Sequence, residues 1–304
     1  MAAKPTLKYQ VMPLTPKGFH MQPTELPSGI PETDEYSNLV QTDLFREMEA
    51  FSDAFLLRNQ SHLAEYARKW VSDPLHNWSR QWEYPYAFGR LAAEALARDT
   101  EELCILDAGS GATFMPHFIR SCFEKSVVHC CDRDGSLEKT HALINQQERQ
   151  AVKFSVSPLD ATGFPNDHFD CIYCVSVLEH TDNRREIMDE FRRILKPGGL
   201  LVVTFDISID GAGDIPPTDA NQLLLEMESR YAVEGQIRGN MSALLGNPNI
   251  VTTTGAWKVN PALLPWKHAP SPWIQIKSFL RHGRKVVFPP PYTVYCLSMR
   301  KRRL

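Results

Sequence analysis

Residues 103–113 read LCILDAGSGAT and carry the pattern from which the fold can be predicted. The apolar run Leu103–Leu106 has the length of a fully buried strand. Gly109 and Gly111 carry no Cβ, so the backbone can turn sharply there and approach a ligand closely. A helix is expected from Phe114 onward, with a proline in its first turn. A strand, a glycine turn and a helix in this order predict a site for a nucleotide-like ligand at the carboxyl edge of a parallel sheet.

The acid before the glycines indicates which kind of ligand is expected. The dinucleotide fingerprint needs a third glycine at the position of Phe114, so a pyrophosphate fits poorly. Asp107 repels phosphate and suits a cationic ligand. The turn resembles the acid-x-Gly-x-Gly motif of the class I S-adenosylmethionine-dependent methyltransferases, although the third glycine common in that family is absent. The resemblance implies a cofactor, S-adenosyl-L-methionine, bound by Asp107, Ala108, Gly109, Ser110 and Gly111.

A second acid follows the next predicted strand, residues 127–131. Asp132 lies 25 residues after Asp107, a span that fits one strand–helix–strand unit. A carboxylate at the end of a second strand can accept hydrogen bonds from both hydroxyls of a ribose. The resemblance implies this ribose role for Asp132 and places its neighbour Arg133 in the same site.

The third predicted strand, Val152–Val156, leads to Asp160 and Ala161. The family often places an acid here that meets the adenine amino group, with the next residue supplying backbone at the ring. Asp160 matches that position. The alternative is a turn-forming aspartate before Gly163, and the sequence does not decide between the two.

The most specific part of the resemblance runs from Phe164 to Gly199. A strand at Cys171–Val175 opens into a Leu-Glu-His run, and a helix at Arg184–Leu195 ends at Lys-Pro-Gly-Gly. The following strand, Leu200–Phe205, is almost continuously apolar and therefore central. Ser176, at the end of the fourth strand, is assigned to the cofactor site on the same resemblance.

The fold class predicted is α/β, a Rossmann-like three-layer sandwich. Its mostly parallel seven-stranded sheet has one antiparallel closing strand, expected at Tyr292–Met299, with N-terminal helices and an inserted cap. The expected divisions are an N-terminal arm and capping helices (1–99), a cofactor-binding core (100–206), a substrate-pocket insertion (207–285), and a closing strand with a basic tail (286–304).

The segment before the core admits two interpretations. Residues 1–39 are rich in proline and are expected to be an extended arm, and helices are expected from residue 38 to 70 and from about Ala87 to Arg98. The aromatic residues between 78 and 88 suit helices packed on a sheet edge. In the family, however, such helices close over the cofactor, where Arg80 could meet the methionine carboxylate and Trp82 the sulfonium through a cation–π contact.

Methyl transfer from a sulfonium requires alignment of acceptor and methyl and exclusion of water. A base helps only where the acceptor must lose a proton. His180, just beyond the fourth strand, is the first candidate, with contact to the cofactor or packing as the alternative; Glu83, His117 and Tyr173 are weaker candidates. No metal ligands are predicted, because Asp206 is followed by isoleucine rather than by the asparagine of the metal-dependent branch.

Composition sets further limits on partners and location. The net charge of −3 over 304 residues gives no reason to expect nucleic acid, and no apolar stretch is long enough to span a membrane. Seven scattered cysteines suit reduced thiols in a cytoplasmic protein. Cys171 and Cys174 resemble a redox or zinc pair, but residues three apart in a strand face opposite sides, so they are expected to pack in the core.

Three functions remain open on the sequence. The leading one is a methyltransferase that acts on a small-molecule acceptor. The second is a nicotinamide-dependent oxidoreductase, which the phenylalanine at the third glycine position disfavours. The third is a protein that binds S-adenosylmethionine without methylating anything, because an intact cofactor site does not prove turnover.

Overall fold

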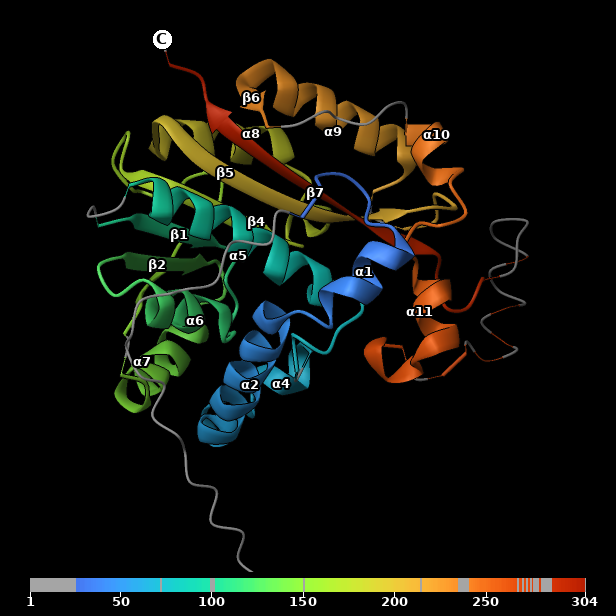
Figure 1. The fold of residues 1–304 in the computed structure, drawn as a ribbon, viewed down its shortest axis with the longest axis horizontal. Coiled ribbons are helices and arrows are strands. Elements are labelled where there is room, and N and C mark those ends of the chain that lie inside the picture. Colours follow the sequence, from blue (N-terminus) through green and yellow to red (C-terminus); the bar gives the residue numbers. More distant parts are fainter. Residues whose placement is uncertain are drawn as a thin grey trace, which may run out of the picture.

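A computed structural model of the chain shows one twisted sheet with helices on both faces (Figure 1). The structure describes residues 26–71, 73–98, 102–149, 151–213, 215–234, 241–266 and 286–303, with six single positions between 268 and 279. Most of the expected extended arm, residues 1–25, lies outside these described residues.

The sheet has seven strands in the order β3-β2-β1-β4-β5-β7-β6. β1, β2, β3, β4 and β5 are parallel to one another, and β7 runs antiparallel to both β5 and β6. This confirms the predicted fold class, including the single antiparallel strand. The bounds are β1 (Cys104–Ala108), β2 (Val127–Asp132), β3 (Lys153–Val156), β4 (Phe169–Val175), β5 (Leu195–Ser208), β6 (Tyr231–Val233) and β7 (Tyr292–Lys301).

Both faces of the central strands are buried, so successive residues alternate between two apolar layers. Ile105 and Cys171 belong to one layer, and Leu106 and Cys174 belong to the other. Cys171 and Cys174 therefore lie on opposite faces as predicted, and all seven cysteines are free thiols. The first layer lies under α5 (Arg80–Ala97), α6 (Met115–Cys122) and α7 (Leu137–Gln147), and the second under α8 (Arg184–Ile194) and α9 (Pro217–Arg230) (Figure 1).

β5 begins earlier than its apolar run predicts. Phe169 pairs with Leu195, and the next pair is Cys171 with Leu200, so the Lys-Pro-Gly-Gly segment bulges out of the ladder. Gly198 has φ +78°, a conformation that suits glycine. The predicted turn is therefore present as a bulge inside the strand, and it separates α8 from the buried part of β5.

The N-terminal helices differ most from the expectation. They are α1 (Thr33–Leu39), α2 (Asp43–Arg58), α3 (Gln60–Leu63) and α4 (Tyr66–Lys69). The extended arm predicted to reach residue 39 is thus wrong for residues 33–39, where Glu32 and Glu35 form a capping box that starts a helix.

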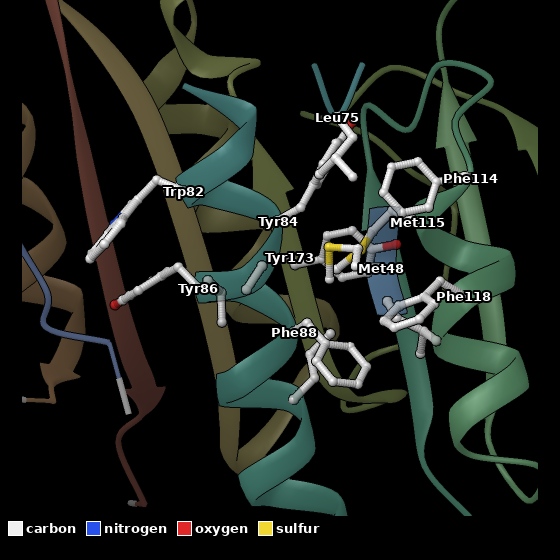
Figure 2. Close-up of a cluster of buried hydrophobic side chains, with 14 of the residues drawn as sticks. Met48, Leu75, Trp82, Tyr84, Tyr86, Phe88, Phe114, Met115, Phe118 and Tyr173 are labelled. Carbon is white, nitrogen blue, oxygen red and sulfur yellow. The ribbon is translucent and has the colours of Figure 1, made fainter. Parts of the chain in front are cut away.

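α5 begins at Arg80, seven residues before the predicted start at Ala87. Pro85 lies inside this helix and removes one backbone donor. The helix persists because the aromatic side chains around the proline are buried on several sides, and packing outweighs local propensity. Figure 2 shows Trp82 and Tyr86 on the side of α5 that faces β7, and Tyr84 and Phe88 on the side that faces α6.

The chain after β5 folds back onto the N-terminal residues. It forms α10 (Met241–Leu245), α11 (Thr253–Val259) and the short 3-10 helix η2 (Pro261–Leu263). The Val251 N–H donates to the Pro31 carbonyl at 2.9 Å, and the Trp78 N–H donates to the Leu263 carbonyl at 2.9 Å. Among the described residues, no helix has the length and apolar character needed to cross a bilayer.

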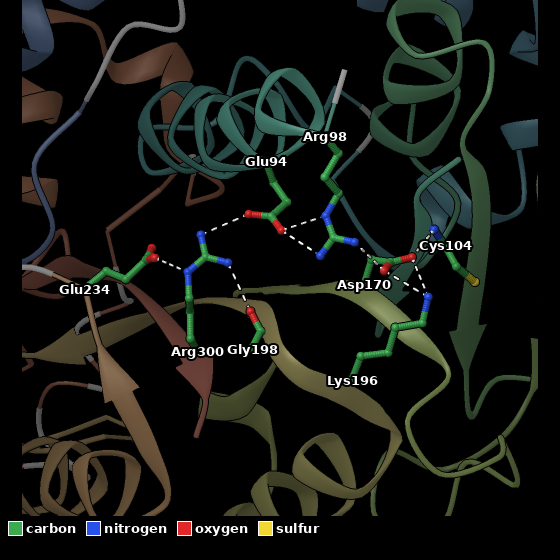
Figure 3. A network of polar contacts seen from close by, with 8 residues as sticks. All are labelled: Glu94, Arg98, Cys104, Asp170, Lys196, Gly198, Glu234 and Arg300. Carbon is green, nitrogen blue, oxygen red and sulfur yellow. Dashed lines mark hydrogen bonds and ion pairs between the residues drawn. The ribbon is translucent and has the colours of Figure 1, made fainter. Parts of the chain in front are cut away.

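Ion pairs join α5 to the amino edge of the sheet, as Figure 3 shows. The buried Asp170 carboxylate accepts from Arg98 and Lys196 at 2.9 Å each, and from the Cys104 backbone N–H at 2.9 Å. Arg300 of β7 pairs with Glu94 of α5 at 2.9 Å. The C-terminal end of α5 is therefore fixed to β1, β4, β5 and β7.

Candidate functional site

The glycine turn at the carboxyl end of β1 is anchored to β2. Gly109 has φ +75° and Gly111 has φ +53°, both in the left-handed region that favours glycine. The N–H groups of Gly109 and Ser110 donate to the Cys131 carbonyl at 2.9 and 3.1 Å. The predicted turn is thus present and rigidly placed between two parallel strands.

Asp132, at the end of β2, holds this turn from the other side. Its Oδ2 accepts from the Gly111 N–H at 3.1 Å, and its Oδ1 accepts from the Asp134 N–H at 2.9 Å. An ionised carboxylate offers about four lone-pair positions, so two remain available for a ligand. Since the side chain is only half-buried, ligand hydroxyls can reach it.

Two side chains lie against the turn. A Cβ added to Gly109 would be 2.6 Å from a Val177 methyl carbon, and one added to Gly111 would collide with the Tyr66 hydroxyl. Tyr66 comes from α4, and burial raises the pKa of its phenol to about 12. α4 therefore contacts the glycine turn through a neutral hydroxyl group, that of Tyr66.

Asp107 lies one strand position before the turn and is 5% exposed. Burial raises the pKa of its carboxyl to about 8, and this effect outweighs the lowering by Tyr173. Tyr173 is the β4 residue directly opposite Asp107 in the parallel register. A cationic ligand beside Asp107 would favour its ionised form.

A polar network joins the start of α5 to the carboxyl ends of β4 and β5. Arg80 Nη1 pairs with Glu83 at 2.5 Å and also donates to the Ser176 hydroxyl. Glu83 is fully buried and accepts from Ser176 Oγ at 2.6 Å and from the Thr204 hydroxyl. Ser176 has φ +48°, and non-glycine residues held in that region concentrate at functional sites.

Further acids surround Arg80. Burial alone would lower the pKa of its guanidinium, but Glu83 and other acids, including Asp206 and Glu179, raise it. Burial raises the pKa of Glu179 to about 8, against the lowering effect of Arg80. Glu179 Oε2 is buried and has no hydrogen-bond partner among the described residues. Among the described residues, the Arg80 cation therefore lies close to several acids and to an unused acceptor, Glu179 Oε2.

Comparison with known proteins assigns this geometry to a family. The profile of a methyltransferase domain matches residues 106–203, which run from β1 into β5. The core of this chain is a class I S-adenosylmethionine-dependent methyltransferase domain. The resemblance drawn from the sequence is confirmed, and S-adenosylmethionine is the cofactor of this domain family.

The methyltransferase domain has curated relatives in quinone biosynthesis. A ubiquinone/menaquinone biosynthesis C-methyltransferase from a Marinomonas species is 33% identical over 103 residues, which are 33% of this chain and 41% of that protein. A ubiquinone biosynthesis O-methyltransferase from Paramagnetospirillum magneticum is 29% identical over 116 residues, which are 38% of this chain and 44% of that protein. The chain therefore spans less than half the length of these relatives.

Solved structures show more distant likenesses. An S-adenosylmethionine-dependent methyltransferase from Aquifex aeolicus is 18% identical, and the match covers 49% of this chain and 83% of that one with a TM-score of 0.39. The [4+2]-cyclase SpnF is 14% identical, and that match covers 70% and 81% of the two chains with a TM-score of 0.43.

The carboxyl edge of the methyltransferase domain brings together many of the residues predicted for its site. The glycine turn and Asp132 lie at the ends of β1 and β2, and Arg80 reaches Ser176 at the end of β4. Asp160 is exposed, and its carboxylate accepts from the Asn183 side-chain amide at 2.7 Å. The remaining predicted residues that are exposed to solvent are Arg133, Ala161 and His180.

Trp82 does not reach the turn of the methyltransferase domain. Its side chain is completely buried and points away from Tyr84 and Phe114, as Figure 2 shows. A ring buried against β7 has no face free for a sulfonium at the end of β1. The structure therefore supports the core-packing alternative for Trp82, and Tyr84 is the aromatic residue of α5 that contacts the turn side, with its ring 5.3 Å from Phe114.

Sequence reasoning missed two residues that lie at this edge, Tyr66 of α4 and Glu179. Tyr66 lies on a four-residue helix whose apolar spacing indicates only packing. Glu179 belongs to the Leu-Glu-His run, but its burial depends on the packing of η1 (Leu178–His180) against the end of β5. Glu83 was considered only as a weak base, and its link between Arg80 and the sheet required the three-dimensional structure.

The site has the features that S-adenosylmethionine requires. The glycines of the turn carry no Cβ, and Val177 and Tyr66 lie where a Cβ would stand. Asp132 keeps acceptors for vicinal hydroxyls. Arg80 uses Nη1 for its contacts within the described residues, which leaves Nε and Nη2 for a carboxylate. A sulfonium and an ammonium group balance the surrounding acids.

Proposed function

We propose that this chain is a metal-independent S-adenosylmethionine-dependent methyltransferase that acts on a small-molecule acceptor. The observation that carries the proposal is Asp132, whose half-buried carboxylate holds the glycine turn and keeps acceptor capacity beyond the two N–H groups that it binds. The bound cofactor supplies an electrophilic methyl group on a sulfonium. The work of the protein is to hold that group, orient the acceptor and exclude water.

The proposed contacts follow the strand order. Asp132 binds the ribose hydroxyls, and Asp160 with Ala161 lies at the adenine. Arg80 binds the methionine carboxylate through Nε and Nη2, the side-by-side pair that suits a planar carboxylate. Asp107, with its raised pKa, becomes ionised beside the ammonium group and so favours a cationic ligand over a phosphate.

His180 remains the proposed base for an acceptor that must lose a proton. It is exposed at the end of η1, where an acceptor entering from solvent can meet it. Its neighbour Glu179 has a carboxyl group whose pKa lies near 8, so it can exchange a proton close to neutral pH. A test of either residue needs an identified acceptor.

The acceptor is proposed to be an aromatic ring of the kind handled in quinone biosynthesis, because the two curated relatives act there. Residues 207–285 are proposed to form the substrate pocket. In support, the described part of that segment packs close to the start of α5, because the Trp78 N–H donates to the Leu263 carbonyl. The ring of Trp266 also stacks on Tyr292, at the start of β7, with 5.9 Å between ring centroids. Seven free thiols suit a reducing compartment, and we propose the cytoplasm.

Two measurements test the proposal. Isothermal titration of the full chain with S-adenosylmethionine, S-adenosylhomocysteine and NADH decides the cofactor, and we expect binding of the first two only. Incubation with methyl-labelled cofactor and a panel of quinone precursors then decides turnover. Transfer of label to a precursor supports the proposal. The same incubation is repeated with cell extract in place of the panel. Cofactor binding without a labelled product in either incubation would instead favour a binding protein without methylation activity.

A further inference from the structure

The amino edge of the sheet carries a cluster of metal-ligating side chains that the methyltransferase site does not use. Cys104 begins β1, His129 lies in the middle of β2, and His168 immediately precedes β4. One ligand atom from each of the three lies within 4.8 Å of the others. Since β2, β1 and β4 are adjacent in the sheet, the fold itself brings these residues together.

The side chains share one face of the sheet. Cys104 alternates with Leu106 and Ala108, and all three lie in the layer covered by α8. His129 is level with Leu106 in the parallel register, and His168 is fixed by its backbone N–H, which donates to the Ile194 carbonyl at 2.7 Å. The cluster is therefore held by backbone on three sides.

The distances suit a tetrahedral ion. A zinc ion lies about 2.3 Å from a sulfur ligand and about 2.0–2.1 Å from a nitrogen ligand. At a tetrahedral angle, these bond lengths put the sulfur and the nitrogen roughly 3.6 Å apart. Cys104 Sγ and His168 Nε2 are 3.7 Å apart. The three ligand atoms all lie within 4.8 Å of one another, so no separation in the cluster exceeds that geometry by more than about 1.2 Å. Small changes in side-chain torsion can close a gap of this size.

The surroundings orient the imidazole rings without occupying the ligand atoms. The ring of His168 stacks on Phe164 with an interplanar angle of 5°, and His129 meets Phe169 edge to face at 5.4 Å. All three ligating residues are half-buried, so water can complete the coordination. An apolar wall with one open side is the setting in which a thiolate and two imidazoles hold a transition metal.

A second cluster provides a contrast. Asp53, Asp73 and His76 also lie within bonding range of one ion. There, however, His76 uses both ring nitrogens, one toward Asp73 at 2.7 Å and the other toward Glu49 at 2.9 Å. That cluster is satisfied as an ion pair. In the Cys-His-His cluster, the polar contact that the described residues show is the long one between Cys104 Sγ and His168 Nε2, and its sulfur and imidazole ligands are chemically softer than carboxylates.

We propose that Cys104, His129 and His168 form a binding site for a divalent transition metal of the zinc class, with a fourth position open to water. The site lies at the edge of the sheet opposite the glycine turn, so it is distinct from the proposed cofactor site and does not depend on it. Its ion would join β1, β2 and the segment before β4.

The test is titration of the tag-free chain with Co²⁺, a spectroscopic probe for zinc sites. We expect saturable binding with a near-ultraviolet thiolate-to-cobalt band and visible bands of tetrahedral intensity, all reversed by Zn²⁺. Cys104→Ser should abolish the thiolate band, and His129→Asn and His168→Asn should each weaken binding at least tenfold. Cys122→Ser, which removes another half-buried free thiol, is the matched control and should leave the spectrum unchanged.

The proposal is overturned if the wild-type chain gives no thiolate band, or if the band survives in Cys104→Ser. Cobalt binding that is unaffected by either histidine variant overturns it equally. Circular dichroism and thermal melting without metal confirm that each variant is folded. If Cys104→Ser does not fold, the two histidine variants decide the same question, because both rings are half-exposed and replaceable by a smaller amide.

Discussion

Replacement of Asp132 by alanine tests the proposed cofactor site most directly. Hydrogen bonds to a charged group contribute about 1.5–3 kcal/mol, so loss of the ribose contacts should weaken S-adenosylhomocysteine binding about 10- to 150-fold. The turn also loses the acceptors for the N–H groups of Gly111 and Asp134, at 3.1 and 2.9 Å. We expect the loss of those two hydrogen bonds to lower the free energy of unfolding by roughly 1–2 kcal/mol.

Asp134→Ala is the matched control for this experiment. Its carboxylate accepts from Ser136 and pairs with Lys69 at 3.5 Å, and its backbone N–H still donates to Asp132 in the variant. Affinity should change less than about threefold, within the range of surface substitutions. Isothermal titration gives both affinities, and urea unfolding shows that the variants are folded. A folded Asp132→Ala variant with wild-type affinity would refute the assignment of this carboxylate to the ribose.

Three further substitutions test the polar networks by urea unfolding. Glu83→Gln should lower the free energy of unfolding by roughly 3 kcal/mol, because it breaks a buried pair with Arg80; a loss under about 0.5 kcal/mol would contradict that role. Asp170→Asn, at the other end of α5, should cost roughly 2 kcal/mol since three donors lose a charged acceptor, and an unchanged midpoint would show that the network does not stabilise the fold. The hydrogen bond to Asp73 raises the pKa of His76 to about 9, so its stabilisation is complete below about pH 6.5 and is lost as the pH rises through about 9. His76→Asn should therefore lower the free energy of unfolding by ~1 kcal/mol at about pH 6, a value reduced for solvent screening of this one-third exposed side chain, and by almost nothing at about pH 10. A difference between variant and wild type that does not change with pH would contradict a charged His76–Asp73 pair.

The fold was predictable because its central signals are local. The apolar run before the glycine turn, the acid after the second strand and the Lys-Pro-Gly-Gly segment each specify one element, and parallel topology then orders them. Where the structure differs, tertiary packing is the cause. α5 continues through Pro85 because the aromatic side chains on both of its sides are buried, and no local propensity scale contains that information.

The candidate site was predictable in part for the same reason. The turn and Asp132 lie at strand ends, where sequence order determines position. Arg80 contacts Ser176 at the end of β4, and its role toward the cofactor stays a prediction. Its neighbour Trp82 points to the other side of the helix, because residues two apart on a helix do not share a face. Tyr66 was not predictable, since its place over Gly111 depends on how two one-turn helices pack.

These contacts differ in strength between the N-terminal helices that lie over the glycine turn. α5 is fixed at its start by Glu83, which binds the ends of β4 and β5, and at its other end by the pairs of Glu94 and Arg98 with the amino edge (Figure 3). A helix held at both ends cannot swing away without breaking buried ion pairs. α3 and α4 are four residues each, too short for independent stability, and α4 carries the hydroxyl that lies against the glycine turn. If the proposed cofactor site is right, we expect displacement of Tyr66, rather than movement of α5, to open the glycine turn to the cofactor.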